Sequence, residues 1–188
     1  TKRLGERDRP KLYAFMRKEA EQGHAVYVVL PRIEGEEGQA AGERRRRRLW
    51  SEVKGVEAEV KRLKEALPGL RVLALHGRLA GEEKDRILAQ LREGKADVLV
   101  STQVIEVGID LPQATLMVIE NAEMFGLPNL HQLRGRVGRS GLKSYCLFFG
   151  EATTEEGEAR LEAFTRCKDG FEIAEADFKL RGPGQFFG

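Results

Sequence analysis

Apolar residues in this chain form short continuous runs, which alternate with longer stretches where apolar residues recur every three or four positions. The continuous runs, which predict buried strands, are residues 25–30, 71–75, 96–100, 116–119 and 144–149. The stretches with helical spacing are residues 10–22, 44–67, 81–93, 130–137 and 155–168. This alternation predicts an α/β fold in which helices flank a mostly parallel sheet.

The two ends of the chain lack these patterns. Residues 1–9 are charged and predict a loose lead-in, while the tail from Asp169 is rich in glycine and aromatic residues with few helical repeats. We expect residues 1–24 to hold a lead-in and the first helix, residues 25–150 the α/β lobe, and residues 151–188 a helical and extended appendage. The tail either wraps in a strand-like conformation that buries its phenylalanines or carries a functional element.

Charge is balanced over the 188 residues, because 32 Lys and Arg oppose 30 Asp and Glu and leave a formal net charge of +2. This balance argues against a general polyanion-binding protein and restricts any nucleic-acid contact to a local patch. No apolar run approaches the roughly 20 residues that span a bilayer, and the amino terminus has no signal-peptide pattern. Cys146 and Cys167 lie in apolar patterns that predict reduced, buried side chains, and we expect no metal site.

A cluster of arginines is the strongest candidate for chemistry. Residues 132–139 read Gln-Leu-Arg-Gly-Arg-Val-Gly-Arg, and Arg136 and Arg139 share one face if this segment is helical. A guanidinium stays charged and presents a planar fork of donors, which suits the phosphates of a nucleotide during phosphoryl transfer. The alternative is that Arg134, Arg136 and Arg139 form an ordinary solvated basic face.

The order of these motifs resembles a known family. Residues 102–110 follow the pattern T-x-V-x-E-x-G-x-D, and together with residues 132–139 they resemble motifs V and VI of superfamily 2 helicases and translocases. Residues 117–127 and the tail around 169–184 are similar to the RecG family of ATP-dependent branched-DNA helicases. The resemblance runs from about residue 25 to residue 188. It implies the C-terminal RecA-like lobe of a P-loop NTPase helicase.

The same resemblance implies roles for individual residues. Arg136 and Arg139 would be catalytic and stabilise charge on the γ-phosphoryl group. Three residues would lie near the nucleotide: Gln132, Gly108 and Asp110. Arg181 and Gly182 would couple ATP hydrolysis to movement on duplex DNA in recombination and repair.

Candidate DNA-binding residues follow two of the predicted strands, at the edge where ligands gather in open α/β sheets. They are His76, Gly77, Arg78, Ser101, Thr102 and Gln103. We expect Ser101 and Thr102 to form a turn at a helix start whose hydroxyl and N–H groups bind a phosphate. His76 is equally open to a structural role, and Ser101 or Thr102 could simply cap the helix.

Two further basic features have open interpretations. Arg32 lies in a Gly- and Glu-rich segment, residues 31–42, which is either a DNA-facing loop or a surface connection. Residues 44–48 are five consecutive arginines at the start of a predicted helix. They form either a solvated helix end, which opposes the helix dipole, or a phosphate contact.

Two motifs of a complete ATPase are missing. No G-x-x-x-x-G-K-[ST] or D-E-x-[DH] occurs, so ATP and Mg²⁺ should be bound mainly by an N-terminal lobe, and this chain alone should be inactive as an ATPase. Because the chain starts at Thr1 rather than Met and ends directly after Gly188, we expect it to be part of a longer protein. The resemblance implies a monomer in the bacterial cytoplasm. Its expected partners are branched or duplex DNA, that N-terminal lobe and a wedge-type DNA-binding domain. The alternatives are a transcription-repair coupling translocase and a non-catalytic RecA-like module that binds nucleic acid.

Overall fold

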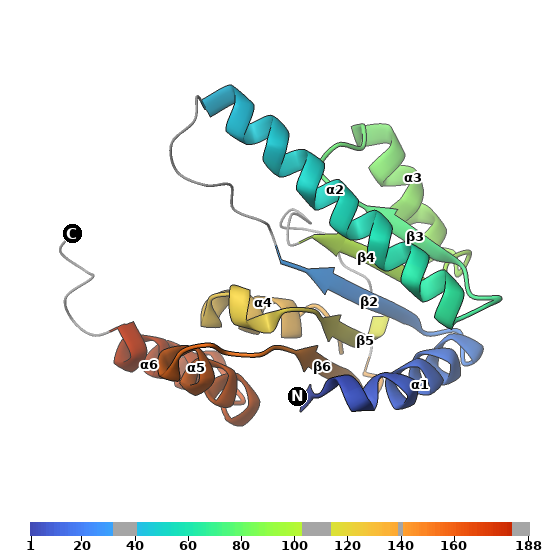
Figure 1. The fold of residues 1–188 in the computed structure, drawn as a ribbon. Coiled ribbons are helices and arrows are strands. Elements are labelled where there is room, and N and C mark those ends of the chain that lie inside the picture. Colours follow the sequence, from blue (N-terminus) through green and yellow to red (C-terminus); the bar gives the residue numbers. More distant parts are fainter. Residues whose placement is uncertain (32–40, 103–113, 139–140, 182–188) are drawn as a thin grey trace.

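The computed structural model describes residues 1–31, 41–102, 114–138 and 141–181, and for residues 41–52 and 181 it describes the backbone alone. Within these ranges, one all-parallel sheet has the strand order β1-β6-β5-β2-β4-β3 (Figure 1). Its strands are β1 (Lys2–Leu4), β2 (Ala25–Leu30), β3 (Val72–Leu75), β4 (Val98–Thr102), β5 (Ala114–Ile119) and β6 (Tyr145–Phe149). The helices are α1 (Arg9–Glu21), α2 (Ala41–Ala66), α3 (Gly81–Arg92), α4 (Leu127–Arg134), α5 (Glu155–Arg166) and α6 (Gly170–Arg181), with short 3-10 turns η1 (Glu6–Asp8) and η2 (Ala122–Met124).

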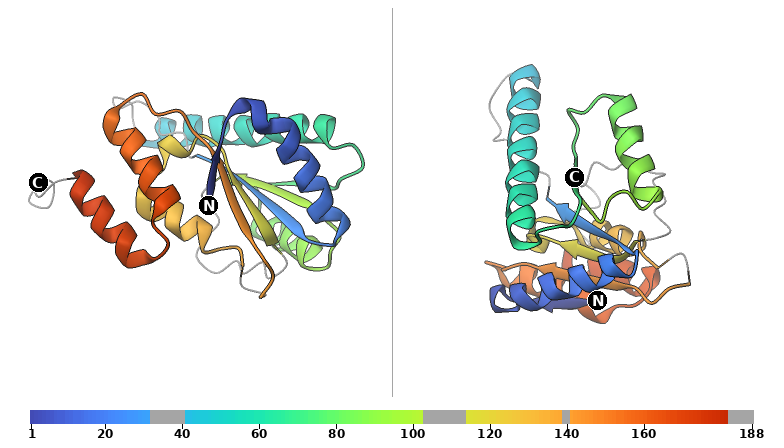
Figure 2. Two further views of the ribbon diagram at one scale, coloured as in Figure 1. Left: turned by 90° about the horizontal axis from the view of Figure 1, so that it is seen from below. Right: turned by 90° about the vertical axis from the view of Figure 1, so that its right-hand side faces the viewer.

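Helices cover both faces of the sheet, as the apolar runs predict for buried parallel strands. Alternate residues of β2 face opposite sides: Val26 and Val28 pack with α1 and α2, whereas Tyr27 and Val29 pack with the cluster that includes α3, α4, α5 and α6. Figure 2 (right) shows α2 and α3 on opposite sides of the sheet. The predicted α/β fold with a parallel sheet is confirmed.

The amino-terminal segment is not the loose lead-in that its charges predict. Residues 2–4 form β1, an edge strand that pairs in parallel with β6 in the register Lys2↔Leu147 and Leu4↔Phe149. The Arg3 side chain donates to the Gly150 carbonyl at 2.7 and 3.1 Å and forms an ion pair with Glu158 on α5. Charged side chains are common on edge strands, so the polar sequence does not prevent pairing. The division of the chain at residues 24 and 150 stays a prediction.

Helix α2 matches the predicted apolar seam. Val53, Val56 and Leu63 are buried, as is Leu67 directly after the helix, and the last three pack with strand residues of the sheet. Residues 44–48 lie in the first turns of the helix backbone. Among the described residues, no helix, this longest one included, has the length and apolar character needed to cross a membrane.

The tail after Asp169 begins with a helix, α6, although its few helical repeats left a strand-like wrap as one of two interpretations. Asp169 accepts hydrogen bonds from the backbone N–H groups of Phe171 and Glu172, both at 2.9 Å, and so satisfies donors that a helix start leaves free. The Glu172 carboxylate in turn accepts from the Lys168 N–H at 2.7 Å. Because this second bond comes from the residue before the N-cap, the arrangement is close to a capping box without being one. The spacing Asp169-x-x-Glu172 is the sequence signal that favours a helix start here. The strand-like interpretation of residues 170–181 is therefore wrong.

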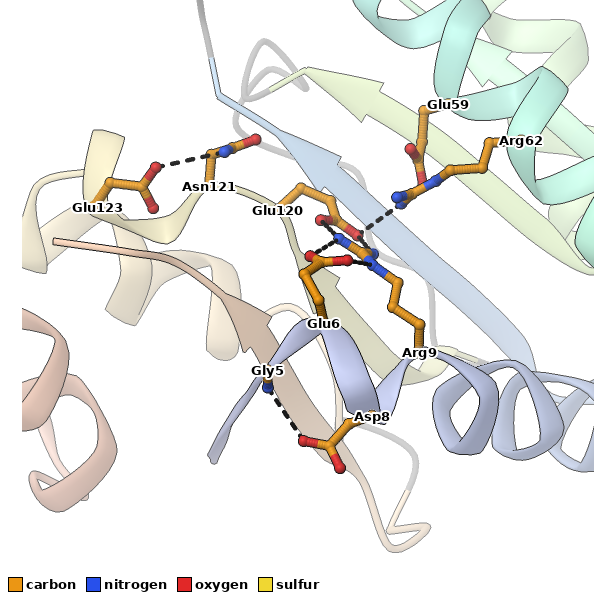
Figure 3. A network of polar contacts seen from close by, with 9 residues as sticks. All are labelled: Gly5, Glu6, Asp8, Arg9, Glu59, Arg62, Glu120, Asn121 and Glu123. Carbon is orange, nitrogen blue, oxygen red and sulfur yellow. Dashed lines mark hydrogen bonds and ion pairs between the residues drawn. The ribbon is translucent and has the colours of Figure 1, made fainter.

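A buried network of charged side chains fixes the end of β5 to two helices (Figure 3). Glu120, which follows β5 directly, is 6% exposed and accepts from both terminal nitrogens of Arg9 on α1, at 2.6 and 2.8 Å. It also accepts from Arg62 on α2 at 3.1 Å. Glu6 and Glu59 complete the pairing of these two arginines at 2.8 and 2.6 Å. Three separate parts of the chain thus meet at one carboxylate.

The network shifts the ionisation of its members. Burial raises the pKa of Glu59, and the neighbouring Arg62 guanidinium opposes that rise only in part. Burial disfavours the charge on Arg9, but the hydrogen bonds that Arg9 donates to Glu120 and Glu6 outweigh this effect and raise the Arg9 pKa. The Arg9 guanidinium also lies over the Phe149 ring, 3.8 Å from its centroid, which adds a cation–π contact. Arg9 therefore stays charged in a largely buried place.

We predict that Glu120→Gln destabilises the protein by about 3 kcal/mol, because the amide nitrogen faces guanidinium donors and leaves buried charge without its acceptor. Urea unfolding monitored by circular dichroism measures this change. Glu6→Gln is the matched control, since the Glu6 side chain is 68% exposed and contacts the same Arg9. Its cost should stay below about 1 kcal/mol. Equal destabilisation by the two variants would contradict a special role for Glu120.

Candidate functional site

The carboxyl ends of β3 and β4 bring together residues that the sequence analysis assigned to DNA. The register Leu75↔Ser101 places His76 and Thr102 at neighbouring positions. Contrary to expectation, Ser101 and Thr102 are not in a turn but are the last residues of β4, and both are buried. The Ser101 hydroxyl donates to the Tyr27 hydroxyl on β2 at 3.2 Å, so it has a structural partner.

Two polar atoms at this edge lack such a partner. Within the described part of the chain, the Thr102 hydroxyl and the His76 Nδ1 are buried and form no hydrogen bond. Burial lowers the pKa of His76 below the ordinary histidine value of 6.5, so the imidazole is neutral at pH 7. Because buried polar groups are nearly always satisfied, these two atoms have hydrogen-bonding capacity to offer a ligand or another segment. Gly77 and the exposed Arg78 follow directly.

The arginine segment is arranged differently from its prediction. Helix α4 ends at Arg134 with Gly135 as its C-cap, so the helix stops three residues before the predicted end at Val137. Arg136 lies in the turn that follows, half-buried, and does not belong to a helical face. Gln132 is exposed on α4. The early stop follows from Gly135, because glycine is a poor helix former and a favoured helix end.

The turn after α4 needs a glycine. Gly138 has a φ of +87°, and a Cβ at this position would lie 3.1 Å from the Ser144 hydroxyl oxygen. Any other residue would be strained here. Arg136, two residues earlier, is close enough to influence Tyr27 electrostatically. Burial raises the pKa of Tyr27 to about 12, while the hydrogen bond from Ser101 and the charge of Arg136 oppose that rise. The next residue, Val137, packs with the core on the face of the sheet that carries α3 and α4.

Arg134 has a structural role that the sequence analysis did not predict. Its guanidinium donates to the carbonyl oxygens of Cys167 and Lys168, at 2.6 and 3.0 Å, in the short link between α5 and α6. It also contacts His131 Nδ1 at 2.9 Å and lies over the Phe164 ring, 5.5 Å from the centroid. The alternative that Arg134 is merely solvated is therefore wrong. Arg134 fastens the hairpin of α5 and α6 to α4.

Several predicted site residues lie outside the described residues: Arg32, Gln103, Gly108, Asp110, Arg139 and Gly182. Arg181 is the last residue of α6, and its backbone alone is described. The structure thus places His76, Gly77, Arg78, Ser101 and Thr102 at one edge of the sheet, and Gln132 and Arg136 at the end of α4. Cys146 and Cys167 are buried and reduced, as predicted.

Residues 11–141 match the protein family described as helicase conserved C-terminal domain. The chain is 47% identical over 178 residues to the ATP-dependent DNA helicase RecG of Thermotoga maritima, covering 95% of this chain and 21% of that protein. It is 44% identical over 183 residues to RecG of Synechocystis sp., covering 97% of this chain and 21% of that protein. The chain spans about a fifth of the length of the curated relatives that it matches.

Solved structures of helicases are similar to this chain as well. A structure of RecG bound to a three-way DNA junction is 40% identical with a TM-score of 0.75, covering 98% of this chain and 22% of that chain. The C-terminal domain of the DEAD-box protein Dbp5 has a TM-score of 0.55 at 21% identity, covering 95% of both chains, and this second likeness concerns the fold alone. Together they confirm the RecA-like helicase C-terminal fold and the predicted resemblance to RecG.

We predict that Arg134→Lys loosens the hairpin, because a single ammonium group cannot bind both carbonyl oxygens as the fork does. Each hydrogen bond to a charged group is worth roughly 1.5–3 kcal/mol, so amide hydrogens of α6 should exchange about ten-fold faster or more. Hydrogen exchange read by mass spectrometry measures this. Arg160→Lys is the control, since Arg160 only pairs with Glu156 within α5 at the surface. If both variants left α6 exchange unchanged, the fastening by Arg134 would be refuted.

Proposed function

We propose, from the premise that this chain belongs to the helicase conserved C-terminal domain family, that it is the second RecA-like motor lobe of a RecG-type ATP-dependent DNA helicase. The similarity to RecG proteins over nearly the whole chain carries this proposal. The complete protein then acts on branched DNA, such as stalled forks and Holliday junctions, in the cytoplasm of a bacterium. We propose further that it works as a monomer, with a wedge-type DNA-binding domain in the same polypeptide.

The nucleotide in such a motor lies between two lobes. This sequence has neither a phosphate-cradling glycine loop ending in Lys-Ser/Thr nor the acidic Mg²⁺ motif, so both ligands are held mainly by the first lobe. This lobe supplies arginines. Arg136, half-buried in the turn after α4, and Arg139 present guanidinium groups to the negative charge of the transferring γ-phosphoryl group. Gln132, Gly108 and Asp110 line the same nucleotide side. Alone, the chain lacks the residues needed to hydrolyse ATP.

The DNA side is the carboxyl edge of β3 and β4. The Thr102 hydroxyl and a nitrogen of His76 provide neutral hydrogen-bonding groups for a phosphate, and Arg78 provides positive charge. Ser101 supports this edge through Tyr27, while Arg32, Gly77 and Gln103 complete the proposed contact. The proposed DNA side therefore has two kinds of phosphate contact. Arg78 makes a charged one and His76 a neutral one, because burial keeps His76 uncharged at pH 7.

Coupling between the two sides uses the hairpin. Arg134 joins the arginine segment to the link before α6, and α6 ends at Arg181, which precedes Gly182. A change at the nucleotide that moves α4 is thereby passed to α6 through two hydrogen bonds. We propose that Arg181 and Gly182 carry this change onward to the DNA.

We predict that Arg136→Ala or Arg139→Ala in the full-length protein lowers DNA-stimulated ATP hydrolysis by about three to five powers of ten, because an arginine finger stabilises the transition state. DNA affinity should hardly change. Steady-state hydrolysis with a branched DNA and an anisotropy titration of the same DNA measure the two quantities.

Arg181→Ala is the contrasting variant in that experiment. It should keep DNA-stimulated hydrolysis but unwind branched DNA poorly, since its proposed role is coupling. An equal loss of DNA affinity in all three variants would overturn the assignment of separate roles.

We predict different salt responses for two neighbouring residues of the DNA side. Arg78→Ala should reduce the slope of log affinity against log salt by about 1, because one phosphate contact is lost. His76→Ala should weaken binding about five- to ten-fold at pH 7.5 without changing that slope, because a neutral imidazole releases no counterion. Anisotropy titrations of the full-length protein over a salt series test both.

The pH dependence gives a second check on His76. Burial lowers its pKa, so the imidazole becomes charged at a lower pH than an ordinary histidine does. The affinity advantage of the unmodified protein over His76→Ala should therefore grow as the pH falls below about 6.5. A ratio of affinities close to 1 at both pH 7.5 and pH 5.5 would exclude a DNA contact by His76.

A further inference from the structure

Helix α6 carries apolar residues on two opposite sides. Ile173, Ala176 and Leu180 face inward and pack with the core that includes α4 and α5. Phe171, Ala174 and Phe178 repeat the same spacing on the opposite side of the helix, because residues two positions apart lie about 200° apart around a helix axis. We name these three residues the outer stripe. An ordinary surface helix has one apolar stripe and a polar opposite face.

The outer stripe is exposed in this lobe. Phe171 is 82% exposed and Phe178 is 51% exposed, and they lie about 10 Å apart along one face of the helix. Figure 2 (left) shows α6 at the outer end of the lobe, beyond α5. A helix with apolar residues on both sides is typical of an interior layer, so the outer stripe is built to be covered.

The charges around the stripe disfavour DNA as the cover. Helix α6 contains three acidic side chains, Glu172, Glu175 and Asp177, against two basic ones, Lys179 and the terminal Arg181. Lys179 is already paired with Glu175 at 2.8 Å. A phosphate backbone would meet net negative charge here, so the complementary surface is that of a protein, apolar at its centre and neutral or basic around it.

The size of the stripe indicates whether the covering surface belongs to a separate protein or to the same polypeptide. Two phenylalanines bury at most about 500 Å², less than the roughly 800 Å² per partner that a stable interface between separate proteins needs. A surface tethered in the same polypeptide needs less, because tethering raises its effective concentration to about the millimolar range. The relatives of this chain are about five times as long, so such a surface is available in them.

We propose that the outer stripe of α6 docks onto an apolar, neutral or basic surface in the part of the full-length polypeptide that precedes this chain. This rests on the proposed function in that the lobe belongs to a longer protein whose other domains precede it. The contact makes α6 an interior helix, held by Arg134 and the core on one side and by the preceding domains on the other.

A photo-cross-linking experiment on the full-length protein tests this. Phe171 is replaced by p-benzoylphenylalanine, and the protein is irradiated with and without branched DNA. We expect a cross-link to a peptide that precedes this chain, within one polypeptide, in both conditions. Cross-linking to the DNA, a cross-linked dimer, or no cross-link would each overturn the proposal.

Two variants sharpen the result. The same cross-linker at Glu162, which is exposed on α5 outside the stripe, should not give that peptide. Phe178→Ser combined with the cross-linker at position 171 should lower its yield several-fold, and an unchanged yield would contradict docking through the stripe. DNA-stimulated ATP hydrolysis is measured on the same preparations. Hydrolysis without the cross-link refutes the docking alone, whereas the cross-link without hydrolysis refutes the motor assignment alone.

Discussion

The carboxylate of Glu120 is the point on which the arrangement of this lobe depends. It holds Arg9 of α1 and Arg62 of α2, which cover one face of the sheet, at the place where β5 ends. The next residue, Asn121, has a φ of 50°, a left-handed conformation that asparagine tolerates better than most residues. The chain then turns to η2, where Ala122 packs on the opposite face. One buried charge thus fixes both the helices behind the sheet and the path toward α4.

The sequence predicts those parts of the fold that depend on local patterns. Apolar runs identify five of the strands because parallel strands with both faces covered must be apolar throughout. Strand β1 escapes this rule, since Lys2 and Arg3 lie at a sheet edge and pair only because β6 is next to them. The end of β4 was missed for a related reason. Ser101 is polar, but its hydroxyl is satisfied by Tyr27, and this partner lies 74 residues away.

The candidate site was predictable as a set of residues and less so as a geometry. The edge formed by His76 and Thr102 follows from where strands end, which the sequence shows. The extent of α4 and the existence of α6 were misjudged because the position of each glycine relative to a helix was not considered. Gly135 ends a helix, whereas Gly170 begins one behind the capping Asp169. At Gly170 a Cβ would lie 3.2 Å from His131 Nε2, so glycine there permits close packing.

The role of Arg134 shows why a motif alone does not define a mechanism. Arg134 and Arg136 are two positions apart in the same pattern, yet Arg134 is in α4 and binds carbonyl oxygens of the link between α5 and α6, whereas Arg136 lies in the turn after the helix. Every residue has a backbone carbonyl, so the sequence does not indicate which carbonyl oxygen a side chain will bind. Because both carbonyls immediately precede α6, the hairpin cannot shift relative to α4 without carrying Arg134 along or breaking charged hydrogen bonds. Arg134 thus joins the end of α4 directly to the link between α5 and α6.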